Sequence, residues 1–318
     1  MKFSLINLST SKIVILRYHS VQKNPDLYDC IIGRSITHSL DEFEEQMEAI
    51  ASDFNPISID DLHGFLKKKI RIPKKAVVIT FDDGFYDNYE YAVPILNRLG
   101  IPATFYISVN CIQNSSIPWF SKLRYCFFNT VTPQWEDPIE HLSHKLNGEE
   151  SRLNAFIKAC RQCTVLVGQQ QSEYIKIIKE QLEISGYPYR NLMMSWDQIG
   201  QLLKMGHTIG SHTMSHPNLA YIDKASLIWE LKESKNILEG KLNKPIFDFS
   251  YPNPALIPNY NQLTYSVVKD SGYRSAVTCD PGPVKRNDDV LLMKRMYVPN
   301  NLNEFLWYLN MSFIGRTI

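Results

Sequence analysis

The chain has 318 residues, of which 44% are apolar, so it can bury a large core, and an α/β barrel of this size normally forms one domain. Its formal charge is only +1, which excludes the basic footprint of a nucleic-acid-binding protein. The sequence contains no transmembrane candidate, because no stretch approaches the roughly 18 apolar residues that would span a bilayer.

The first residues, 1–12, begin with a basic Lys2 but lack an uninterrupted apolar core and a small-residue cleavage site. A standard signal peptide is therefore not expected, and the sequence favours a cytoplasmic protein. The cysteines suit a reducing compartment, because they show no repeated paired spacing. The string from Cys160 to Cys163 lies in an amphipathic segment without turn glycines, so neither metal binding nor redox activity is expected there.

The predicted elements start with a short apolar strand over 13–16, whose register places His19 at its C-terminal end. A helix is expected over 41–51, where apolar residues recur at helical spacing. A strand followed by a helix is the unit from which α/β folds are built.

A continuous apolar and β-branched run over 76–81 predicts a strand that is buried on both faces of a parallel sheet. Asp82, Asp83 and Gly84 follow at its C-terminal end, where α/β barrels carry their catalytic groups. Gly84 permits a tight exit, and the two adjacent aspartates point in different directions. One carboxylate can then hold a metal ion while the other faces the substrate.

A helix over 89–99 and a strand over 101–109 come next. The interval 111–190 is several times longer than a normal loop, so a structureless connection is improbable and a helical insertion is expected. Its start is aromatic, with Trp119 and Phe120. These side chains either cover the mouth of a site on the barrel or simply pack the insertion onto it.

A second polar string follows a helix expected over 192–205 and a short strand over 207–210. His212 and His216 are four residues apart, and a single helical turn would bring them to one face. Imidazole nitrogens and carboxylate oxygens bind zinc-like ions, and catalytic sites usually stop at three protein ligands so that water can bind. Two imidazoles and one aspartate would form such a site, and the second aspartate could deprotonate the water.

The remaining segments complete the strand, motif and helix order of a parallel barrel. A helix is expected over 224–242, and strands over 276–279 and 291–298. The stretch 302–313 is interpreted as a helix that closes the barrel, with contact to a membrane or lipid tail as the alternative.

Each polar string also has an ordinary interpretation, because two aspartates before a glycine can be a turn and a lone histidine can be a surface or core residue. Their combination, each after an apolar run, favours a functional site. The strings resemble the motifs of the polysaccharide deacetylase family (NodB homology, carbohydrate esterase family 4). In that family the first motif is TFDDG, as in 80–84, and the second is H-[ST]-x-x-H, as in 212–216. The likeness extends over 76–108 and 192–219, and more weakly over 245–254.

The resemblance implies a distorted (β/α)7 barrel. Length and composition agree with a single catalytic domain of this kind over residues 1–318, within which 111–190 is the expected helical insertion.

By resemblance, Asp82 is the general base, and Asp83, His212 and His216 are the ligands of a divalent metal ion. Zinc is the expected ion, although an N₂O donor set suits cobalt and nickel as well. His19 takes the role of general acid, as in a permuted branch of the family that begins with a Tyr-His string. A histidine with only a structural role is the alternative.

The third motif departs from the family pattern, which reads Arg-x-Pro-Tyr-Gly or Ala-Tyr-Pro-Tyr-Gly. Here 249–254 reads FSYPNP, so Asn253 can still offer a backbone N–H to an oxyanion, whereas Pro254 changes the turn. The arginine of the motif is missing, and so is the Asp-x-x-Trp string that orients the catalytic histidine. Arg17 or Arg295 could occupy that space, and spacing selects neither. Altered substrate fit is expected rather than loss of catalysis.

The resemblance implies metal-assisted hydrolysis of an N-acyl group, acetyl in the first place, on an amino sugar of a surface-glycan or glycan-precursor pathway. A cytoplasmic member is expected to act on a nucleotide-linked or lipid-linked sugar, and the aromatic start of the insertion could stack on the sugar ring. An N-deformylase or another small-amide hydrolase is the alternative on the same fold. A non-catalytic glycan-binding relative would be expected to have lost a site residue, and an interaction protein would not depend on metal. The oligomeric state is left open.

Overall fold

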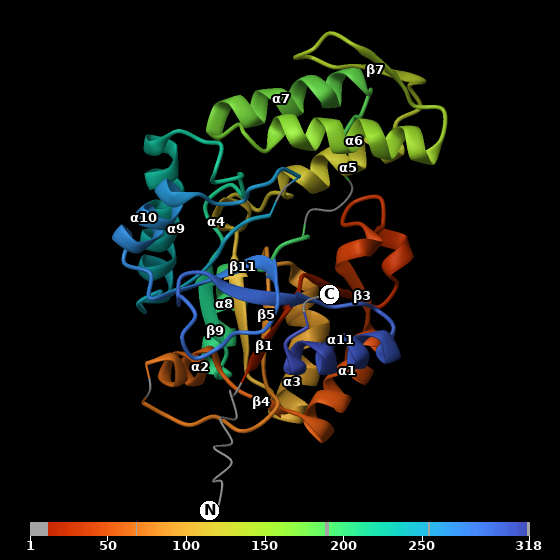
Figure 1. Ribbon diagram of the computed structural model, residues 1–318. Helices are drawn as coiled ribbons and strands as arrows, with labels where there is room; N and C mark the ends of the chain where they lie inside the picture. The colour runs from red at the N-terminus through yellow and green to blue at the C-terminus, as the bar shows by residue number, and fades with distance from the viewer. Residues whose placement is uncertain (1–11, 68, 188–190, 254, 317–318) are drawn as a thin grey trace, which may run out of the picture.

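A closed barrel of seven parallel strands forms the centre of the molecule in the computed structural model, which describes residues 12–67, 69–187, 191–253 and 255–316 (Figure 1). The strands are β1 (Ile13–Tyr18), β5 (Ala76–Phe81), β6 (Ala103–Ile107), β9 (Thr208–Ser211), β10 (Asp248–Ser250), β11 (Ser275–Pro281) and β12 (Met293–Tyr297). Around the barrel they follow the order β1-β12-β11-β10-β9-β6-β5, and β5 pairs with β1 to close the ring. A short strand, β4 (Asn55–Pro56), adds to β5 outside the ring. The expected (β/α)7 barrel is confirmed.

Burial on both faces explains why β1 and β5 read as continuous apolar runs. The two strands pair from Ile13 with Ala76 to Tyr18 with Phe81, and every residue of β5 is buried. Alternate residues belong to two apolar clusters. One cluster packs the barrel against most of the surrounding helices. The other joins inward side chains of β1, β5, β6, β11 and β12 with apolar residues of the segment 57–65.

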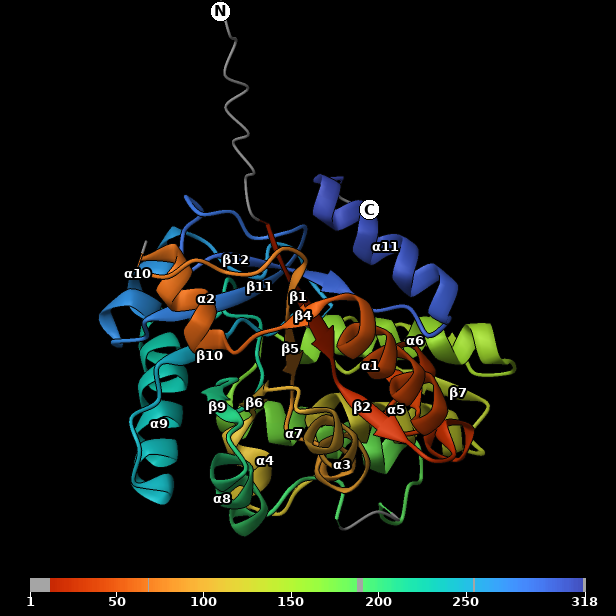
Figure 2. The same cartoon turned by 90° about the horizontal axis from the view of Figure 1, so that it is seen from below.

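Helices surround the barrel, as the view along it shows (Figure 2). They are α1 (Leu40–Asp53), α2 (Ile59–Leu66), α3 (Val93–Leu99), α8 (Trp196–Lys204), α9 (Lys224–Leu242), α10 (Gln262–Asp270) and α11 (Leu302–Ile314). A π-helical turn, η3 (Asn88–Ala92), runs directly into α3. Helices are therefore present in each of the expected segments around the barrel.

The start of α8 differs from the expected helix over 192–205. The Ser195 hydroxyl accepts a hydrogen bond from the Gln198 N–H, which caps the helix at Trp196. The residues before the cap are extended instead, because Met194 N–H donates to the Gly84 carbonyl. This contact ties the chain before α8 to the turn that follows β5.

The last helix, α11, closes the side of the barrel, which agrees with the first of its two expected roles. Phe305 and Leu309 are fully buried, and the Phe313 ring stacks on Phe54 at 5.9 Å. Trp307 is on the opposite face and is 51% exposed. Among the residues that the structure describes, none of the helices combines the length and the apolar character needed to cross a bilayer.

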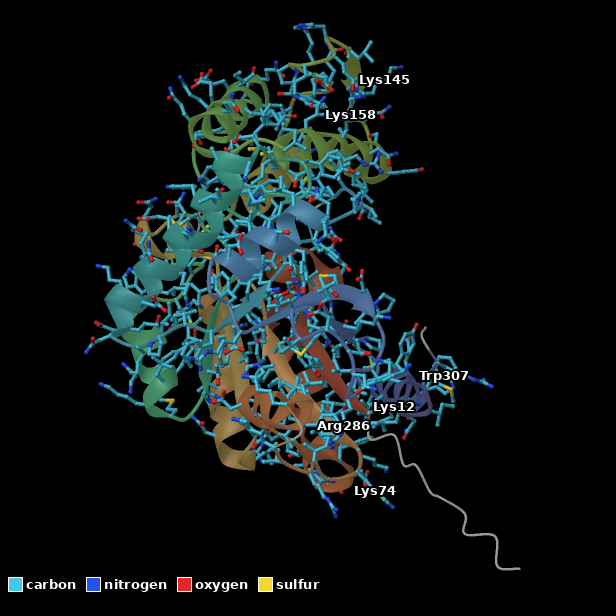
Figure 3. The ribbon with its side chains drawn as sticks, turned by 60° about the vertical axis from the view of Figure 1, so that its left-hand side comes forward. Lys12, Lys74, Lys145, Lys158, Arg286 and Trp307 are labelled. Carbon is cyan, nitrogen blue, oxygen red and sulfur yellow. The ribbon has the colours of Figure 1, made fainter. Side chains whose placement is uncertain are left out.

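The segment between β6 and β9 builds a unit with its own apolar core. After the short α4 (Val109–Gln113) come α5 (Trp119–Asn129), the hairpin β7 (Gln134–Glu136) and β8 (Ser143–Lys145), α6 (Glu149–Cys163) and α7 (Gly168–Gln181). The core of this unit contains Phe127, Trp135 and Ile178. The unit lies over one end of the barrel (Figure 1), and its Lys145 and Lys158 are at the opposite end of the molecule from Lys74 and Arg286 (Figure 3).

The helices and strands do not test two expectations, the domain assignment and the absence of a signal peptide. The assignment of 1–318 to one catalytic domain with an insertion over 111–190 stays a prediction. The absence of a signal peptide was inferred from 1–12, and residues 1–11 lie outside the described part of the chain.

Candidate active site

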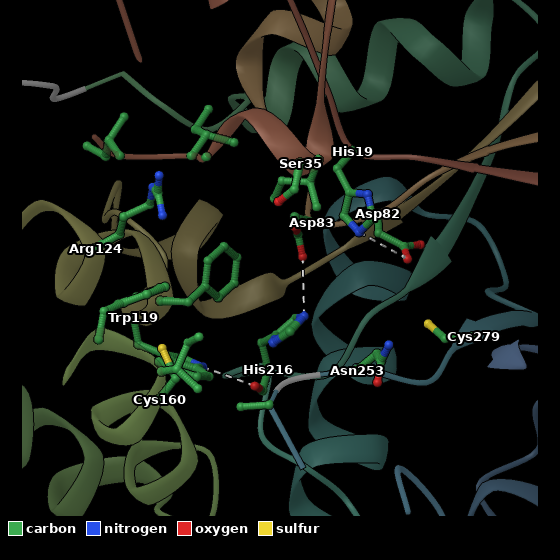
Figure 4. A pocket seen from close by; sticks show the side chains of 18 of the residues that line it. His19, Ser35, Asp82, Asp83, Trp119, Arg124, Cys160, His216, Asn253 and Cys279 are labelled. Atoms are coloured by element: carbon green, nitrogen blue, oxygen red, sulfur yellow. Dashed lines mark hydrogen bonds and ion pairs between the residues drawn. The ribbon is translucent and has the colours of Figure 1, made fainter. Parts of the chain in front are cut away.

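One pocket of about 390 Å³ brings together every site residue expected from the sequence (Figure 4). These residues are His19, Asp82, Asp83, His212, His216 and Asn253. His19 follows β1, the aspartates follow β5, His212 follows β9 and Asn253 follows β10. The pocket therefore lies at the C-terminal ends of the parallel strands, as in other α/β barrels.

Asp83, His212 and His216 form a group that could hold a metal ion. The Oδ1 atom of Asp83 is 3.4 Å from Nε2 of His216 and 3.7 Å from Nε2 of His212. Ligand atoms of a tetrahedral zinc ion, each about 2.1 Å from the metal, lie about 3.4 Å from one another. Asp83 Oδ1 is also buried without a hydrogen-bond partner in the described residues. The donor set, spacing and unsatisfied oxygen all fit a small divalent cation.

The two histidines are brought together by a loop, so the single helical turn expected over 212–216 is wrong. Thr213 and His216 have positive φ angles of 67° and 58°, which a right-handed helix does not contain. The Thr213 hydroxyl oxygen accepts a hydrogen bond from the His216 N–H at 3.0 Å. The two imidazole rings have centroids 4.8 Å apart as a result.

A buried carboxylate from α9, Glu230, supports this loop and is a site residue that the sequence motifs do not include. Glu230 accepts hydrogen bonds from the N–H groups of Met214 at 2.8 Å and Ser215 at 2.9 Å, and from the Ser215 hydroxyl. Glu230 is fully buried. Its position could have been found, because it shares the apolar side of the helix with Leu227 and Leu231.

Hydrogen bonding and burial prepare both imidazoles for a metal. Nδ1 of His212 lies 2.8 Å from the Ser250 carbonyl, so it carries the proton and leaves Nε2 free toward Asp83. Burial lowers the pKa of His212, and burial together with His212 lowers the pKa of His216 well below its usual value. Both rings are therefore neutral, which is the form that binds metals.

Asp82 points the other way and is held by a buried arginine from β12. Nη1 and Nη2 of Arg295 donate to the two carboxylate oxygens of Asp82 at 2.8 and 2.7 Å. The remaining donors of Arg295 bind the Thr278 carbonyl at 2.9 Å and the hydroxyls of Thr80 at 3.2 Å and Ser250 at 3.0 Å. Because the whole guanidinium is fixed, the orientation of the Asp82 carboxylate is fixed too.

This ion pair also sets the charge of Asp82. Burial alone would raise the pKa of Asp82, but the Arg295 guanidinium outweighs it and holds that pKa well below its usual range. For Asp83, which has no such partner, burial and the neighbouring Asp82 charge raise the pKa. A cation at the imidazole group would favour the ionised form of Asp83.

His19 lies beside Asp82, with its Nε2 atom 4.0 Å from Oδ2 of the carboxylate. Its backbone carbonyl accepts a hydrogen bond from the Asn88 side chain at 2.6 Å. Asp87 in turn accepts from the Ser20 hydroxyl at 2.5 Å, so η3 and its preceding residue hold the loop that carries the histidine. Burial lowers the pKa of His19 to about 3, although Asp82 opposes this shift. The imidazole is therefore neutral in the resting pocket.

The segment with this geometry also matches a family model. Residues 69–276 match the model described as polysaccharide deacetylase. The chain belongs to the polysaccharide deacetylase family. Family membership supports an enzyme that acts on N-acetylated amino sugars.

Two curated proteins illustrate the similarity in sequence. The Bacillus subtilis (strain 168) protein YxkH is 21% identical over 289 residues, which cover 91% of this chain and 72% of that protein. The poly-beta-1,6-N-acetyl-D-glucosamine N-deacetylase of Staphylococcus aureus (strain N315) is 27% identical over 207 residues, covering 61% and 70%.

Solved structures of deacetylases share the fold. The Streptococcus pyogenes deacetylase PplD, solved in complex with acetate, superposes with a TM-score of 0.63 at 18% identity, over 94% of this chain and 99% of that one. IcaB from Ammonifex degensii gives a TM-score of 0.62 at 16% identity, over 95% and 97%. At these identities the likeness establishes the barrel that this chain shares with polysaccharide deacetylases.

The structure shows which arginine takes the place of the one that is missing from the third motif of the polysaccharide deacetylase pattern. Of the two arginines that the sequence left open, Arg295 binds Asp82. Asn253 is exposed at the pocket, and Pro254 lies outside the described residues. The sequence could have indicated Arg295 through the alternation of the predicted strand 291–298. In that strand Met293 and Arg295 point inward and are buried, while Lys294 between them is exposed.

The aromatic start of α5 borders the metal group. The Trp119 indole N–H donates to the His216 carbonyl at 3.0 Å, and the centroid of the Phe120 ring is 5.1 Å from that of the His216 ring. Trp119 is almost fully buried, so it mainly packs the segment onto the barrel, whereas Phe120 is partly exposed in the pocket.

Proposed function

We propose that this chain is a metal-dependent hydrolase that removes an N-acyl group, acetyl in the first place, from an amino sugar. One observation carries the proposal. The group formed by Asp83, His212 and His216 shares a pocket with a carboxylate, Asp82, that is ionised and held in a fixed orientation. Membership of the polysaccharide deacetylase family supports the same activity.

Asp83, His212 and His216 would hold the divalent ion, and their N₂O donor set fits zinc, with cobalt and nickel as substitutes. When bound, such an ion polarises the amide carbonyl and lowers the pKa of a water. The two imidazoles are neutral and need no proton loss before they bind the ion, whereas Asp83 must lose the proton that burial and the Asp82 charge favour.

Asp82 would act as the general base toward the attacking water. Arg295 keeps this carboxylate ionised but also makes it a weak base, so the proton would not remain on Asp82. His19 is 4.0 Å away and neutral, so it can take up that proton and donate it to the departing amine, which leaves poorly as an anion.

The tetrahedral oxyanion would be stabilised in part by the backbone N–H of Asn253. A donor of this kind is typically worth about 3 to 4 kcal/mol in the transition state.

We also propose that the substrate belongs to a surface-glycan or glycan-precursor pathway and is attached to a nucleotide or lipid carrier. The protein would be cytoplasmic and would form one catalytic domain over 1–318.

The test is release of acetate and formate from N-acetyl and N-formyl amino sugars, by the zinc-loaded protein beside Asp82→Asn. Removing a positioned base typically costs about 10²- to 10⁴-fold in rate, so the variant should lose at least 100-fold while it still binds zinc. Asp270→Asn makes the same change at an exposed position outside the pocket and should keep the activity.

Formate release in place of acetate would identify a deformylase. Zinc bound in one equivalent with no release from any sugar would contradict the proposal and favour a glycan-binding or interaction protein.

A further inference from the structure

A second arginine, Arg17, lines the catalytic pocket together with His19, Asp82 and Asp83. It belongs to β1, where it is paired with Thr80 of β5 and with Tyr297 of β12. Arg17 is thus two residues before His19 and one strand away from the aspartates. None of the roles proposed above uses it.

The guanidinium of Arg17 lacks an anionic partner in the described part of the chain. Its Nε atom is buried without a hydrogen bond. Neither carboxylate of the pocket forms an ion pair with Arg17 in the described residues, since Asp82 is bound through both oxygens by Arg295, and Asp83, although the Arg17 charge acts on it, faces the imidazoles. A partly buried cation without a counter-charge is costly, so a ligand that brings the missing negative charge would be favoured.

Arg124, the other arginine that lines this pocket, provides a comparison. Its Nη2 atom lies 3.0 Å from a carboxylate oxygen of Asp29, and its Nε–H donates to the Asp29 carbonyl. The charge of Arg124 is therefore already compensated. Arg17 is the arginine of this lining that forms no ion pair among the described residues.

A hydroxyl lies next to this guanidinium. Ser35 and Arg17 both line the main pocket and also a small adjoining cavity of about 20 Å³, so the two side chains border the same corner. Ser35 is exposed, and it lies on the side of the pocket that carries His19 (Figure 4). A guanidinium fork and a hydroxyl together supply the donors that the non-bridging oxygens of a phosphoryl group accept.

The walls beyond this corner are apolar. Ile36 and, from α6, Phe156 and Ile157 keep exposed surface in this lining, and the buried Ile31 and Ile32 lie behind it. Ile157 remains 36% exposed. The pocket thus continues past the charged corner with surface suited to an apolar group rather than to further hydroxyls.

We infer that the substrate of this pocket is an N-acylated amino sugar that carries a phosphoryl group, bound by Arg17 and Ser35. The inference rests on the proposed deacylase activity and specifies its substrate class. The phosphoryl group could belong to a sugar 1-phosphate, a nucleotide sugar or a lipid-linked sugar. The apolar walls favour the lipid-linked form, and separate arms of the test distinguish the three.

The experiment compares kcat/KM of the zinc-loaded protein for matched substrates. N-acetylglucosamine 1-phosphate, UDP-N-acetylglucosamine and a farnesyl-diphosphate-linked N-acetylglucosamine are each measured against the uncharged methyl glycoside. A hydrogen-bonded charge pair of this kind corresponds to about a 10- to 100-fold preference for at least one phosphorylated substrate.

Three variants test whether Arg17 causes the preference for phosphorylated substrates. Arg17→Gln should reduce the ratio between phosphorylated and uncharged substrates to about one, and Arg17→Lys should retain part of it because the charge remains. Arg98→Gln is the matched control, since Arg98 is on the surface of α3 with Glu44 as its partner and should leave the ratio unchanged. Zinc stoichiometry and thermal unfolding show whether each variant is folded.

A binding measurement separates this inference from the proposed function. Calorimetric titration of the metal-free protein with N-acetylglucosamine 1-phosphate should show binding that Arg17→Gln weakens about 10-fold or more. The metal-free form is used because a phosphate could otherwise bind the ion directly. This readout remains informative if no substrate is hydrolysed, in which case the proposed function fails and the phosphoryl site is still tested.

Two results would overturn the inference. Equal hydrolysis of charged and uncharged sugars, unaffected by Arg17→Gln, would leave the deacylase in place and remove the phosphoryl site. An equal preference for the methyl glycoside of N-acetylmuramic acid would show that Arg17 recognises negative charge in general and not a phosphoryl group.

Discussion

At the scale of single residues, the pair formed by Asp82 and Arg295 determines what the pocket can do. Both side chains are almost fully buried, with Arg295 1% exposed. Each is stable inside the barrel only because the other is present, since an unpaired buried charge is strongly destabilising. The pair therefore has a structural role in addition to the orientation of Asp82.

Replacing Arg295 by methionine should lower the free energy of unfolding by about 3 to 5 kcal/mol, because Asp82 would remain buried without its partner. The double variant Arg295→Met with Asp82→Asn should recover much of this loss, since no charge is then left unpaired. Denaturant unfolding of the wild type, both single variants and the double variant measures the coupling. Strictly additive losses would show that the two residues stabilise the barrel independently.

At the scale of elements, the loop after β9 depends on α9. The loop contains two residues with positive φ, Thr213 and His216, a conformation that is costly for residues other than glycine. Glu230 stabilises it from α9 through two backbone N–H groups and a hydroxyl. Glu230 is thus a positioning residue for the proposed metal ligands.

Glu230→Ala should weaken zinc binding by about 10- to 100-fold, the loss typical of removing a group that orients metal ligands. Competition with a chromophoric chelator measures this affinity directly, without reference to activity. Glu233→Ala on the same helix is the control, because in the described part of the chain the hydrogen bonds to this loop come from Glu230 and none comes from Glu233. Unchanged zinc affinity in a folded Glu230→Ala protein would refute the positioning role.

The sequence predicts those parts of the site that depend on a single element, and it fails where two distant elements must meet. The positions of Asp82 and Asp83 followed from an apolar run and the local direction of a strand end. The partner of Asp82 could not be selected in this way, because Arg295 is 213 residues away in the chain and the barrel must close before the two meet. The loop over 212–216 was misjudged as a helical turn for a related reason, since its shape depends on Glu230 of another element.

At the scale of the whole molecule, a buried histidine couples stability to pH. Nδ1 of His207 accepts a hydrogen bond from the Ala103 N–H at 3.2 Å, which connects the start of β9 to β6. Burial lowers the pKa of His207 to about 4 from 6.5. Below pH 6.5 the unfolded chain therefore takes up a proton that the folded protein refuses until about pH 4.

Stability should consequently fall as the pH is lowered from 6.5 to 4, with His207 contributing on the order of 3 kcal/mol across that interval. In His207→Asn, the amide oxygen can still accept from Ala103 but cannot titrate, so the decline should be shallower. Urea unfolding at a series of pH values gives the two slopes. Parallel curves for the wild type and His207→Asn would assign the acid sensitivity to other groups.

The order in which the site residues occur along the chain has a consequence for synthesis. The proposed metal ligands all belong to β5 and β9 and the residues that follow them, whereas Arg295 is on β12, the last strand of the barrel. β12 also pairs with β1, the first strand. A chain emerging from the ribosome therefore holds every proposed ligand of the ion well before it holds the arginine that orients Asp82. Ring closure between the first and last strands is the step that completes the catalytic pocket. A truncated chain that ends before β12 would contain the proposed metal ligands but would lack the arginine that orients Asp82.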